Sequence, residues 1–292
     1  MIRKLALLLG VVLLAVVSAW ALTKEKPVEA AFPMTIVDDE GVTTTVAAAP
    51  DTVASFAPFI TETLFAIGSG DRIIAVSAAE TYPPEATAIT RAVSKDGLTP
   101  DVARLRQLAP DLVMSSGFKD AAWKTELRDA GIAVVTFEAH SVDDALNDLD
   151  VITRLMGQPK TALVSHMRKR VQSMRGSVNP TRPKVFFETF FPPLTGAGLS
   201  GFATDMVNTA GGAVVANAEH GEYVGWTLEQ LRAKDPDIYL LPTSSPALAS
   251  RPGFSQLRAR VLTLDDELIL RPGPRMVDGL DKMAAFFKLP AV

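Results

Sequence analysis

The sequence of 292 residues contains no cysteine, which excludes disulfide bonds, thiolate metal sites and thiol catalysis. It also has no excess of basic residues. The formal net charge is −4, so we expect no nucleic-acid partner. Histidine is scarce, with three in the chain, and neither the H-x-x-x-H nor the G-x-S-x-G spacing occurs. Because the carboxylates are scattered rather than paired, we expect no enzymatic activity, no resident cofactor and no metal site.

The N-terminus has the pattern of a signal peptide. Arg3 and Lys4 precede an apolar run over residues 5–17, and Ala19-Trp20-Ala21 follows as a small-x-small cleavage site. These residues predict a signal peptide over 1–21 and a mature protein in the periplasm. An uncleaved anchor is the alternative, because the apolar stretch reaches Leu22 and nearly spans a bilayer. Without a cysteine, the protein is not expected to be a lipoprotein.

The most informative feature is an internal repeat. Residues 103–114 read ARLRQLAPDLVM, and residues 229–240 read EQLRAKDPDIYL. Aligned without a gap, the two copies share a leucine, an arginine, a proline and an aspartate, at Leu105/Leu231, Arg106/Arg232, Pro110/Pro236 and Asp111/Asp237. Each copy is typical of a short helix, a Pro-Asp turn and a buried strand. A repeat at this separation predicts two similar lobes with a ligand bound between them.

The remaining pattern predicts an α/β fold of two Rossmann-like lobes with central, parallel-rich sheets. In the first lobe, an apolar strand (52–56), a helix (61–67) and a second strand (72–76) follow one another with glycines between. This alternation is typical of parallel β/α units, and it resumes in the second half of the chain. We therefore predict an N-terminal lobe over 34–140 and a C-terminal lobe over 183–292.

The segment between the lobes predicts a connector helix over 141–175. Ser141 and Asp144 form a capping pattern, and apolar residues recur at helical spacing, at Leu146, Leu149, Ile152 and Leu155. We expect one long helix, straight or kinked at Pro159, that joins the two lobes.

Seven short segments carry a resemblance to a known family. They are VASFAPFITETLFAIGSGDRIIAVS (53–77), TYPPEA (81–86), LAPDLV (108–113), AGI (130–132), FATDMVNTAGG (202–212), TLEQLRAKDPDIYL (227–240) and RPGPR (271–275). In this order and spacing the chain resembles the periplasmic iron-complex and cobalamin binding proteins, the substrate receptors of ABC importers. The resemblance implies a class III periplasmic binding protein, with two lobes that close little around the ligand. It also implies a monomer that delivers an iron complex or tetrapyrrole-sized nutrient to an ABC permease dimer at the membrane.

A glycine motif offers a reading of a different class. Residues 196–201 read G-A-G-L-S-G, which matches the G-x-G-x-x-G of dinucleotide-binding sites, and Glu219 follows the next strand. However, the glycines begin several residues beyond the preceding strand, and an exported protein has no access to nicotinamide pools. We favour a loop that lines the ligand site, and a dinucleotide-dependent enzyme stays the alternative.

Several aromatic and basic residues are candidates for ligand contacts. The resemblance places a ligand loop at Phe190 and Phe191, and the loop before the second repeat copy could offer a histidine or tyrosine to haem or ferric iron. Few aromatics fall where a cobalamin site would need them, whereas arginines can grip an anionic iron complex through paired hydrogen bonds. We therefore favour a siderophore-type complex over cobalamin or haem. The candidates are Phe59, Tyr82, Arg91, Phe190, Phe191, His220, Tyr223, Trp226, Arg271 and Arg275.

The arginine candidates differ in the partners that the sequence offers them. Arg275 begins the last helix, where the helix dipole disfavours a cation, so it needs a partner such as Asp278 or Asp281. Arg91 and Arg271 have no obvious partner nearby in the sequence. We therefore expect Arg91 and Arg271 to clamp the ligand from opposite lobes.

The resemblance also implies two docking sites for the permease. The family presents one glutamate on each lobe to arginines of the permease, and Glu229 occupies this position in the second lobe. The gapless repeat places Ala103 at the equivalent position of the first lobe. Asp101, near the start of the same helix, is the substitute candidate, although both acids also suit helix starts on their own.

Overall fold

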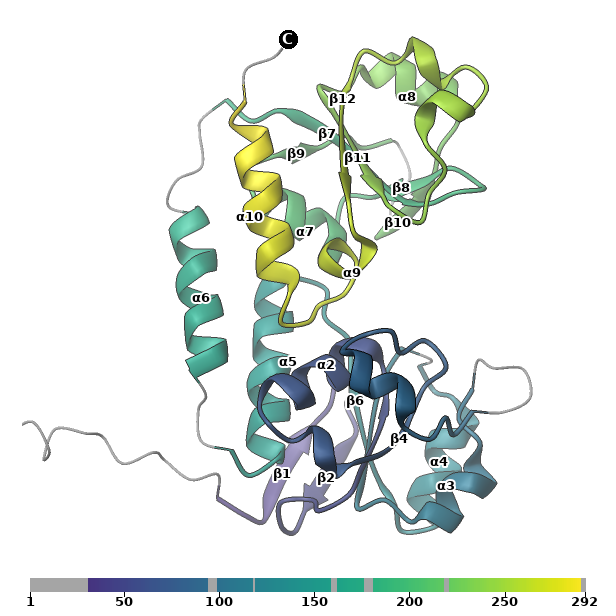
Figure 1. The fold of residues 1–292 in the computed structure, drawn as a ribbon, viewed down its shortest axis with the longest axis vertical. Helices are drawn as coiled ribbons and strands as arrows, with labels where there is room; N and C mark the ends of the chain where they lie inside the picture. The colour runs from purple at the N-terminus through teal and green to yellow at the C-terminus, as the bar shows by residue number, and fades with distance from the viewer. Residues whose placement is uncertain are drawn as a thin grey trace, which may run out of the picture.

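The computed structural model describes residues 31–93, 99–117, 119–158, 162–175, 181–217 and 221–289. Figure 1 shows two lobes, one above the other, beside a column of helices that runs along one side of both. The predicted signal peptide lies outside the described residues. Within the ranges given above, no helix is both long and apolar enough to cross a membrane.

A four-stranded parallel sheet forms the centre of the first lobe. The elements of this lobe are, in chain order, β1 (Met34–Val37), β2 (Thr43–Val46), β3 (Val53–Phe56), α2 (Pro58–Ala66), η1 (Gly70–Arg72), β4 (Ile73–Val76), η2 (Pro84–Ala88), α3 (Val102–Leu108), β5 (Leu112–Ser116), α4 (Ala122–Asp129) and β6 (Ala133–Phe137). The strand order is β4-β3-β5-β6, and each neighbouring pair is parallel. The antiparallel hairpin β1–β2 lies beside β6, where the Thr44 hydroxyl donates to the carbonyl of Val134.

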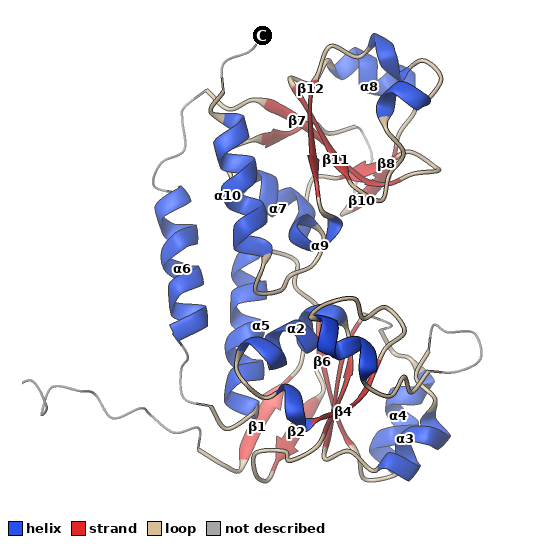
Figure 2. Ribbon diagram, viewed as in Figure 1, coloured by secondary structure: helices blue, strands red, loops and turns tan. Residues whose placement is uncertain are grey.

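The residues of these strands divide between two faces. Val53, Leu112 and Met114 pack with α2 on one face, and Ala54 and Val113 pack with α3 and α4 on the other. Because helices cover both faces of the sheet, its strands are almost continuously apolar. Figure 2 shows this layering, with red strands between blue helices.

The second lobe has a larger, mixed sheet. Its elements are β7 (Lys184–Phe190), β8 (Thr195–Ala197), α7 (Phe202–Thr209), β9 (Ala213–Val214), β10 (Tyr223–Gly225), α8 (Leu228–Lys234), β11 (Ile238–Pro242), η3 (Leu248–Ser250), η4 (Phe254–Gln256), β12 (Arg260–Leu264), α9 (Asp266–Ile269) and α10 (Met276–Phe287). The parallel part runs β9-β7-β11-β12, which repeats the first-lobe order β4-β3-β5-β6. Strands β8 and β10 add an antiparallel extension beside β7. The predicted α/β fold of two lobes with parallel-rich sheets is confirmed.

The internal repeat has the predicted structure in both lobes. Helices α3 and α8 each end at a residue in the left-handed conformation, Ala109 with φ 45° and Asp235 with φ 44°. A proline follows in each copy, and then an aspartate leads into the central strand β5 or β11. Leu105 and Leu231, the shared leucines, are both fully buried beneath their helices. The repeat is therefore one local structure used twice.

The helical segment between the lobes differs from the expected single helix. It forms two helices, α5 (Val142–Leu155) and α6 (Ala162–Arg175). They pack side by side in antiparallel directions, as shown by the ion pair between Arg175, at the end of α6, and Asp143, near the start of α5. Helix α5 ends at Leu155, and Gly157, two residues later, has a φ of +73° that prevents the right-handed helix from continuing. The expected break at Pro159 lies outside the described residues.

Helix α5 alone joins the two lobes. Its first half, with Val142, Leu146 and Leu149, belongs to the core of the second lobe, and its second half, with Ile152 and Leu155, belongs to the core of the first. Helix α6 returns along it and packs into the second-lobe core. The prediction of a helical connection is thus correct in kind, while the single helix over 141–175 is wrong.

Candidate ligand-binding site

The carboxyl ends of the two sheets face one another. All strands of a parallel sheet end at the same edge, and ligands of open α/β sheets bind beyond that edge. Thr81, which follows β4, donates a hydrogen bond to Glu267 in α9, which follows β12. His140, which follows β6, lies 2.6 Å from Glu222 beside β10, measured from Nδ1 to Oε1. The facing surfaces of the two lobes between the Thr81–Glu267 contact and the His140–Glu222 contact are the candidate site. They are called the interlobe face.

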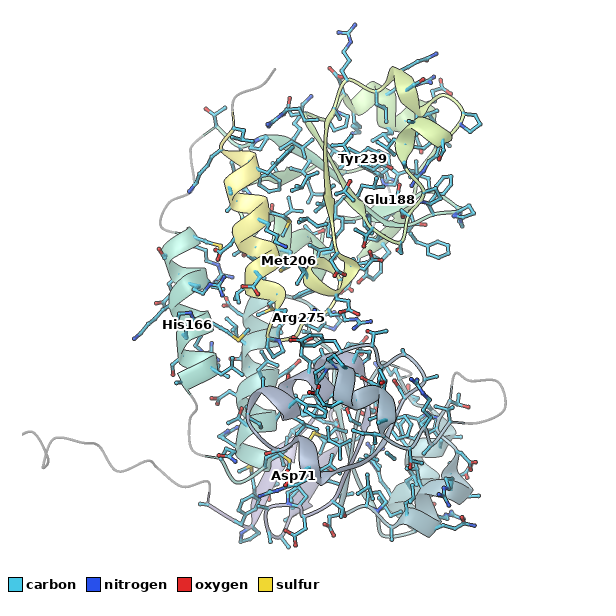
Figure 3. The ribbon with its side chains drawn as sticks, in the orientation of Figure 1. Asp71, His166, Glu188, Met206, Tyr239 and Arg275 are labelled. Atoms are coloured by element: carbon cyan, nitrogen blue, oxygen red, sulfur yellow. The ribbon has the colours of Figure 1, made fainter. Side chains whose placement is uncertain are left out.

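Arg275 is the central cation of the interlobe face. Its Nη2 lies 2.9 Å from Oε2 of Glu62 in the first lobe and 2.6 Å from Oε2 of Glu267 in the second. Its Cζ lies 3.7 Å from the centre of the Tyr82 ring. Burial alone would lower the pKa of this guanidinium, but the hydrogen bonds to both glutamates outweigh burial and raise the pKa. Figure 3 shows Arg275 between the two lobes.

The partners of Arg275 are not the predicted ones. Asp278 and Asp281 were expected to pair with it, but both lie on the side of α10 that faces α6, where they bind Arg170. Glu62 reaches Arg275 instead because α2 packs against the loop before α10. Arg275 therefore has one carboxylate partner in its own lobe, Glu267, and a second in the first lobe, Glu62.

Arg271 also has partners, contrary to the expectation from the sequence. Its Nη1 lies 3.0 Å from Oε1 of Glu267, one helical turn earlier, and donates to the hydroxyl of Thr81 at 3.0 Å. The interval 267–271 falls across the end of α9, so the pair was not evident from the sequence pattern. Arg271 therefore links the lobes before any ligand is bound.

Arg91 keeps an exposed guanidinium beside a buried carboxyl group. Its Nη1 donates to the carbonyl oxygens of Ser77 and Ala78. Glu80 is 2% exposed; it accepts from the Ser77 hydroxyl through Oε1, while Oε2 has no hydrogen-bond partner among the described residues. Burial raises the pKa of Glu80, and the charges of Arg271 and Arg91 oppose this shift. Arg91 and Arg271, the two arginines predicted to clamp the ligand, therefore both lie near the carboxyl group of Glu80.

The aromatic candidates separate into exposed and buried groups. Tyr82, Phe190 and Tyr223 have 39%, 57% and 55% of their surface exposed. Phe190, the last residue of β7, pairs with Thr195 of β8, which in turn pairs with Gly225 of β10. Tyr223 lies two residues before Gly225 on the same strand. Cross-strand partners project from the same face of a sheet, so Phe190 and Tyr223 share a face. Burial raises the pKa of the Tyr223 hydroxyl, with a further contribution from Glu222.

Three other candidates do not present a free ring. Phe59 is 4% exposed and packs in the first-lobe core, where it contacts the backbone at Gly273. Trp226 is 7% exposed and packs edge-on against Phe186 in the second lobe, 5.2 Å between ring centres. Both rings fill the apolar layers of their lobes, and their roles as ligand contacts stay predictions. Phe191 stacks on a buried arginine, and His220 lies outside the described residues.

The glycine motif is filled by the chain itself. A side chain at Gly198 would lie 2.0 Å from the carbonyl oxygen of Gly221, and one at Gly201 would lie 2.8 Å from the side chain of Glu222. Gly201 caps α7 with φ +93°. A carboxylate thus lies over the start of α7, where a dinucleotide would need to place its phosphates. Close packing of residues 221–222 explains Gly198 and Gly201, and Gly196 is crowded by the rings of Phe186 and Trp226.

The family model described as periplasmic binding protein matches residues 53–272. The chain belongs to the periplasmic binding protein family.

Relatives within this family support the assignment. The ABC transporter substrate-binding lipoprotein YvrC of Bacillus subtilis is 31% identical over 280 residues, which cover 90% of this chain and 88% of YvrC. Among solved structures, the vitamin B12 binding protein BtuF of Vibrio cholerae has a TM-score of 0.71 at 21% identity, over 82% of this chain and 97% of BtuF. An Fe³⁺-hydroxamate transport protein from Saccharomonospora viridis also has a TM-score of 0.71, at 22% identity, over 89% of this chain and 100% of its own. At such identities the structures establish the shared fold.

The two docking candidates differ in the freedom of their carboxylates. Glu229 is exposed in the first turn of α8. Asp101 is the N-cap of α3, and its side chain accepts a hydrogen bond of 2.9 Å from the backbone of Arg104. In α8 the equivalent cap is Thr227, which leaves Glu229 unused by the cap. The capping role considered for Asp101 is therefore present.

A cavity lies at the opposite edge of the first sheet. It has a volume of about 590 Å³ and is lined by residues 45–51, 109–111 and 130–133. These segments precede β3, β5 and β6, so the cavity lies at the amino ends of the strands. Because the interlobe contacts all lie at the carboxyl ends, this cavity is separate from the interlobe face.

Sequence reasoning missed the acidic residues of the interlobe face. Glu62 and Glu267 form ion pairs with the arginines and Glu80 lies near them, yet the sequence analysis singled out none of the three. Glu62 did carry a signal, because it lies in α2 among the apolar residues 59–65 and is 4% exposed. A lone carboxylate in a buried helix needs a cation, and that requirement could have identified it.

Proposed function

We propose that the protein is a periplasmic substrate-binding protein that captures a siderophore-type iron complex between its lobes and delivers it to an ABC permease. One observation carries the proposal: exposed aromatic rings and an exposed guanidinium gather at the facing carboxyl ends of both sheets. Tyr82 and Arg91 come from the first lobe, and Phe190 and Tyr223 come from the second. Family membership and the names of the relatives agree with transport rather than catalysis.

The proposed ligand contacts follow from the free surfaces of these residues. The exposed rings offer apolar faces to the organic part of a chelate. Arg91 has guanidinium donors beyond the Nη1 used by Ser77 and Ala78, and these suit carboxylate or hydroxamate oxygens. Arg271 and Arg275 act mainly through Glu267 and Glu62, so their direct contribution to the ligand is smaller than the sequence suggested.

A corrinoid or haem is the second candidate. The glutamate partners of Arg271 and Arg275 favour this candidate. These ion pairs reduce the positive charge of the interlobe face, and a strongly anionic ligand would require that charge. The wide, exposed rings of Phe190 and Tyr223 suit a flat macrocycle.

A direct titration separates these ligands. The purified mature protein is titrated with a ferric trihydroxamate, with haemin and with cyanocobalamin, and binding is followed by absorbance and by quenching of tryptophan fluorescence. We expect the ferric complex to bind most tightly and the metal-free hydroxamate to bind at least about tenfold more weakly, because the metal fixes the shape of the chelate. Tightest binding of cyanocobalamin or haemin would select the second candidate. Failure of all three would contradict the proposed function.

The dinucleotide-dependent enzyme is the less favoured alternative, since Glu222 and Gly221 fill the space beside the glycine motif. Addition of NAD(H) or NADP(H) should leave tryptophan fluorescence and thermal stability unchanged. A thermal shift with either cofactor would revive that reading.

A further inference from the structure

The second lobe contains a buried ion pair that ligand capture does not yet explain. Glu188 of β7 is fully buried and Arg251 is 4% exposed. The pair is bidentate, with Nη1 of Arg251 2.6 Å from Oε2 of Glu188 and Nη2 3.0 Å from Oε1. The hydroxyl of Tyr239, on the adjacent strand β11, donates to Oε2 of the same glutamate. Figure 3 shows Glu188 and Tyr239 close together inside the second lobe.

Arg251 also binds the loops that follow two neighbouring strands. Its Nε and Nη2 donate to the carbonyl oxygen of Pro246, in the loop after β11, at 2.9 and 2.6 Å. The face of its guanidinium lies on the ring of Phe191, in the loop after β7, with Cζ 4.0 Å from the ring centre. The ring of Phe254 packs edge-on against the ring of Phe191, with 6.1 Å between the ring centres. One side chain therefore connects both loops at the carboxyl end of the second sheet.

The contact with Arg251 fixes which of two adjacent phenylalanines is exposed. Phe191 packs against the second-lobe core, whereas Phe190, the last residue of β7, is 57% exposed. Phe190 ends the strand and Phe191 begins the turn that follows it. The anchored ring of Phe191 therefore fixes the backbone from which the exposed ring of Phe190 projects.

We propose that Arg251 is a positioning residue that holds Phe191 in the lobe and thereby presents Phe190 to the ligand at the interlobe face. The ligand part of this inference rests on the proposed function. It also means that Phe191, a ligand candidate from the sequence, supports the site from behind.

Arginine is required for this role because of its shape. Its planar guanidinium can bind a carboxylate through two parallel hydrogen bonds while its face stacks on an aromatic ring. Lysine would keep the charge that balances Glu188 but would lose both the fork and the flat face. Arg251→Lys therefore removes the positioning geometry and retains charge balance, which makes it the informative variant.

The first lobe supplies a matched control. Lys124 of α4 forms a buried pair with Glu40 at 2.5 Å, and their side chains are 1% and 5% exposed. Lys124 also lies over a ring, that of Trp123, at 5.5 Å. Lys124→Arg is thus another exchange of the cation in a buried pair, in the lobe without Phe190.

The first measurement needs no ligand. 4-Fluorophenylalanine is placed at position 190 or 191, and the ¹⁹F shift is compared in H₂O and D₂O to report solvent exposure. In the unaltered protein we expect the signal from position 190 to respond to the solvent and that from position 191 to be insensitive. Arg251→Lys should make position 191 responsive, and Lys124→Arg should leave both signals unchanged. A position 191 that stays insensitive in Arg251→Lys would overturn the positioning role.

The second measurement tests the consequence for the ligand. Affinities are measured for the ferric trihydroxamate, haemin and cyanocobalamin, using whichever probe binds the unaltered protein. Phe190→Ala and Arg251→Lys should each weaken binding by about tenfold, the effect of one well-packed aromatic contact. The double variant should bind no more weakly than Phe190→Ala alone, because Arg251 acts through Phe190.

The outcomes separate this inference from the proposed function. Additive losses in the double variant, or an unchanged affinity in Arg251→Lys, would overturn the inference. An affinity lost in Lys124→Arg as well would show that general destabilisation, rather than positioning, is responsible. If none of the probes binds the unaltered protein, the proposed function fails, while the ¹⁹F result still decides whether Arg251 positions the two phenylalanines.

Discussion

The two lobes are alike at the amino ends of their sheets and differ at the carboxyl ends. At the amino ends, the repeat aspartates bind the residue before the neighbouring strand. Asp111 accepts hydrogen bonds from Asp51 and Thr52 before β3, and Asp237 accepts one from Lys184 at the start of β7. This contact recurs because it aligns the two central strands of each sheet, whatever the lobe binds.

At the carboxyl ends, the lobes have little in common. The first lobe offers the loop after β4, with Glu80, Thr81 and Tyr82, while the second inserts β8 and β10 beside β7 and exposes Phe190 and Tyr223. The duplicated part of the chain builds the sheets, and the divergent part forms the interlobe face. The proposed ligand would therefore meet different side chains in each lobe.

The largest expected effect concerns Glu229 of α8, whose equivalent position in α3 is the uncharged Ala103. Glu229→Arg on α8 should abolish transport and leave ligand affinity unchanged, because the exposed carboxylate is proposed to bind the permease. Uptake of the labelled ligand by cells and equilibrium titration of the purified variant measure the two effects. Ala103→Arg, at the equivalent position on α3, tests whether the first lobe docks in the same place. Equal losses of uptake and affinity in Glu229→Arg would contradict the docking role.

The next largest effect is on stability, and it compares a buried aspartate in α5 with an exposed aspartate in α10. Asp148 in α5 is 7% exposed, and burial, with the charges of Asp39 and Asp144, raises its pKa to about 8. Between pH 4 and 8 the folded chain holds a proton that the unfolded chain releases, so this residue lowers stability as pH rises. Asp148→Asn should therefore stabilise the protein by about 3 kcal/mol at pH 9, or roughly 6 °C, and hardly at pH 4.

Helix α10 provides the comparison for that measurement. Its Asp278 is half exposed and pairs with Arg170 at 2.9 Å. Asp278→Asn should change the melting temperature by little, and in the destabilising direction. A stabilisation of equal size in both variants would show that a general reduction of negative charge is responsible.

A smaller effect distinguishes the two repeat aspartates. Asp111 accepts from the backbone of Asp51 and from both the backbone and the hydroxyl of Thr52, whereas Asp237 accepts from Lys184. Urea unfolding should show a loss of about 2 kcal/mol for Asp111→Ala and about 1 kcal/mol for Asp237→Ala, reduced by their solvent exposure. Equal losses would indicate that the two additional hydrogen bonds of Asp111, from the backbone of Asp51 and the hydroxyl of Thr52, contribute nothing.

The pH dependence offers a check on the same aspartate. Hydrogen bonds from Thr52 hold the pKa of Asp111 below its ordinary value. The stabilisation is therefore complete above about pH 4 and disappears as pH falls through the lowered pKa of the folded state. The difference between Asp111→Ala and the unaltered protein should shrink in acid, and a constant difference would contradict the ionic contribution.

The smallest expected effect is in overall shape. Because α5 belongs to both cores and Arg275 and Arg271 already join the lobes, ligand binding should change the radius of gyration by less than about 1 Å. Small-angle X-ray scattering of the empty and loaded protein measures this. A compaction of several ångströms would reveal a hinge and would break the picture of two fixed lobes.

The sequence predicts the parts of this structure that depend on local patterns. The predicted strands 52–56 and 72–76 match β3 and β4, and both repeat copies form the expected helix, turn and strand because Pro110 and Pro236 end their helices. The connector was less predictable, since the apolar spacing of 141–175 is the same for one helix or two, and only the conformation of Gly157 distinguishes them.

The contacts between the lobes could not be predicted in this way. Glu62 and Arg275 are 213 residues apart in the chain, and no periodicity connects them. The same limit applies to the burial of Phe59 and Trp226, which depends on packing against distant elements. The exposed residues Tyr82, Phe190 and Tyr223 remain predicted contacts.

The division of α5 between two cores has a consequence for how the protein unfolds. If the second lobe melted, Val142, Leu146 and Leu149 would lose their packing, and the shortened helix that remained would be too short to persist alone. The first lobe would then lose the support of Ile152 and Leu155. Thermal unfolding should accordingly proceed as a single cooperative transition, and neither lobe expressed by itself would be a stable domain.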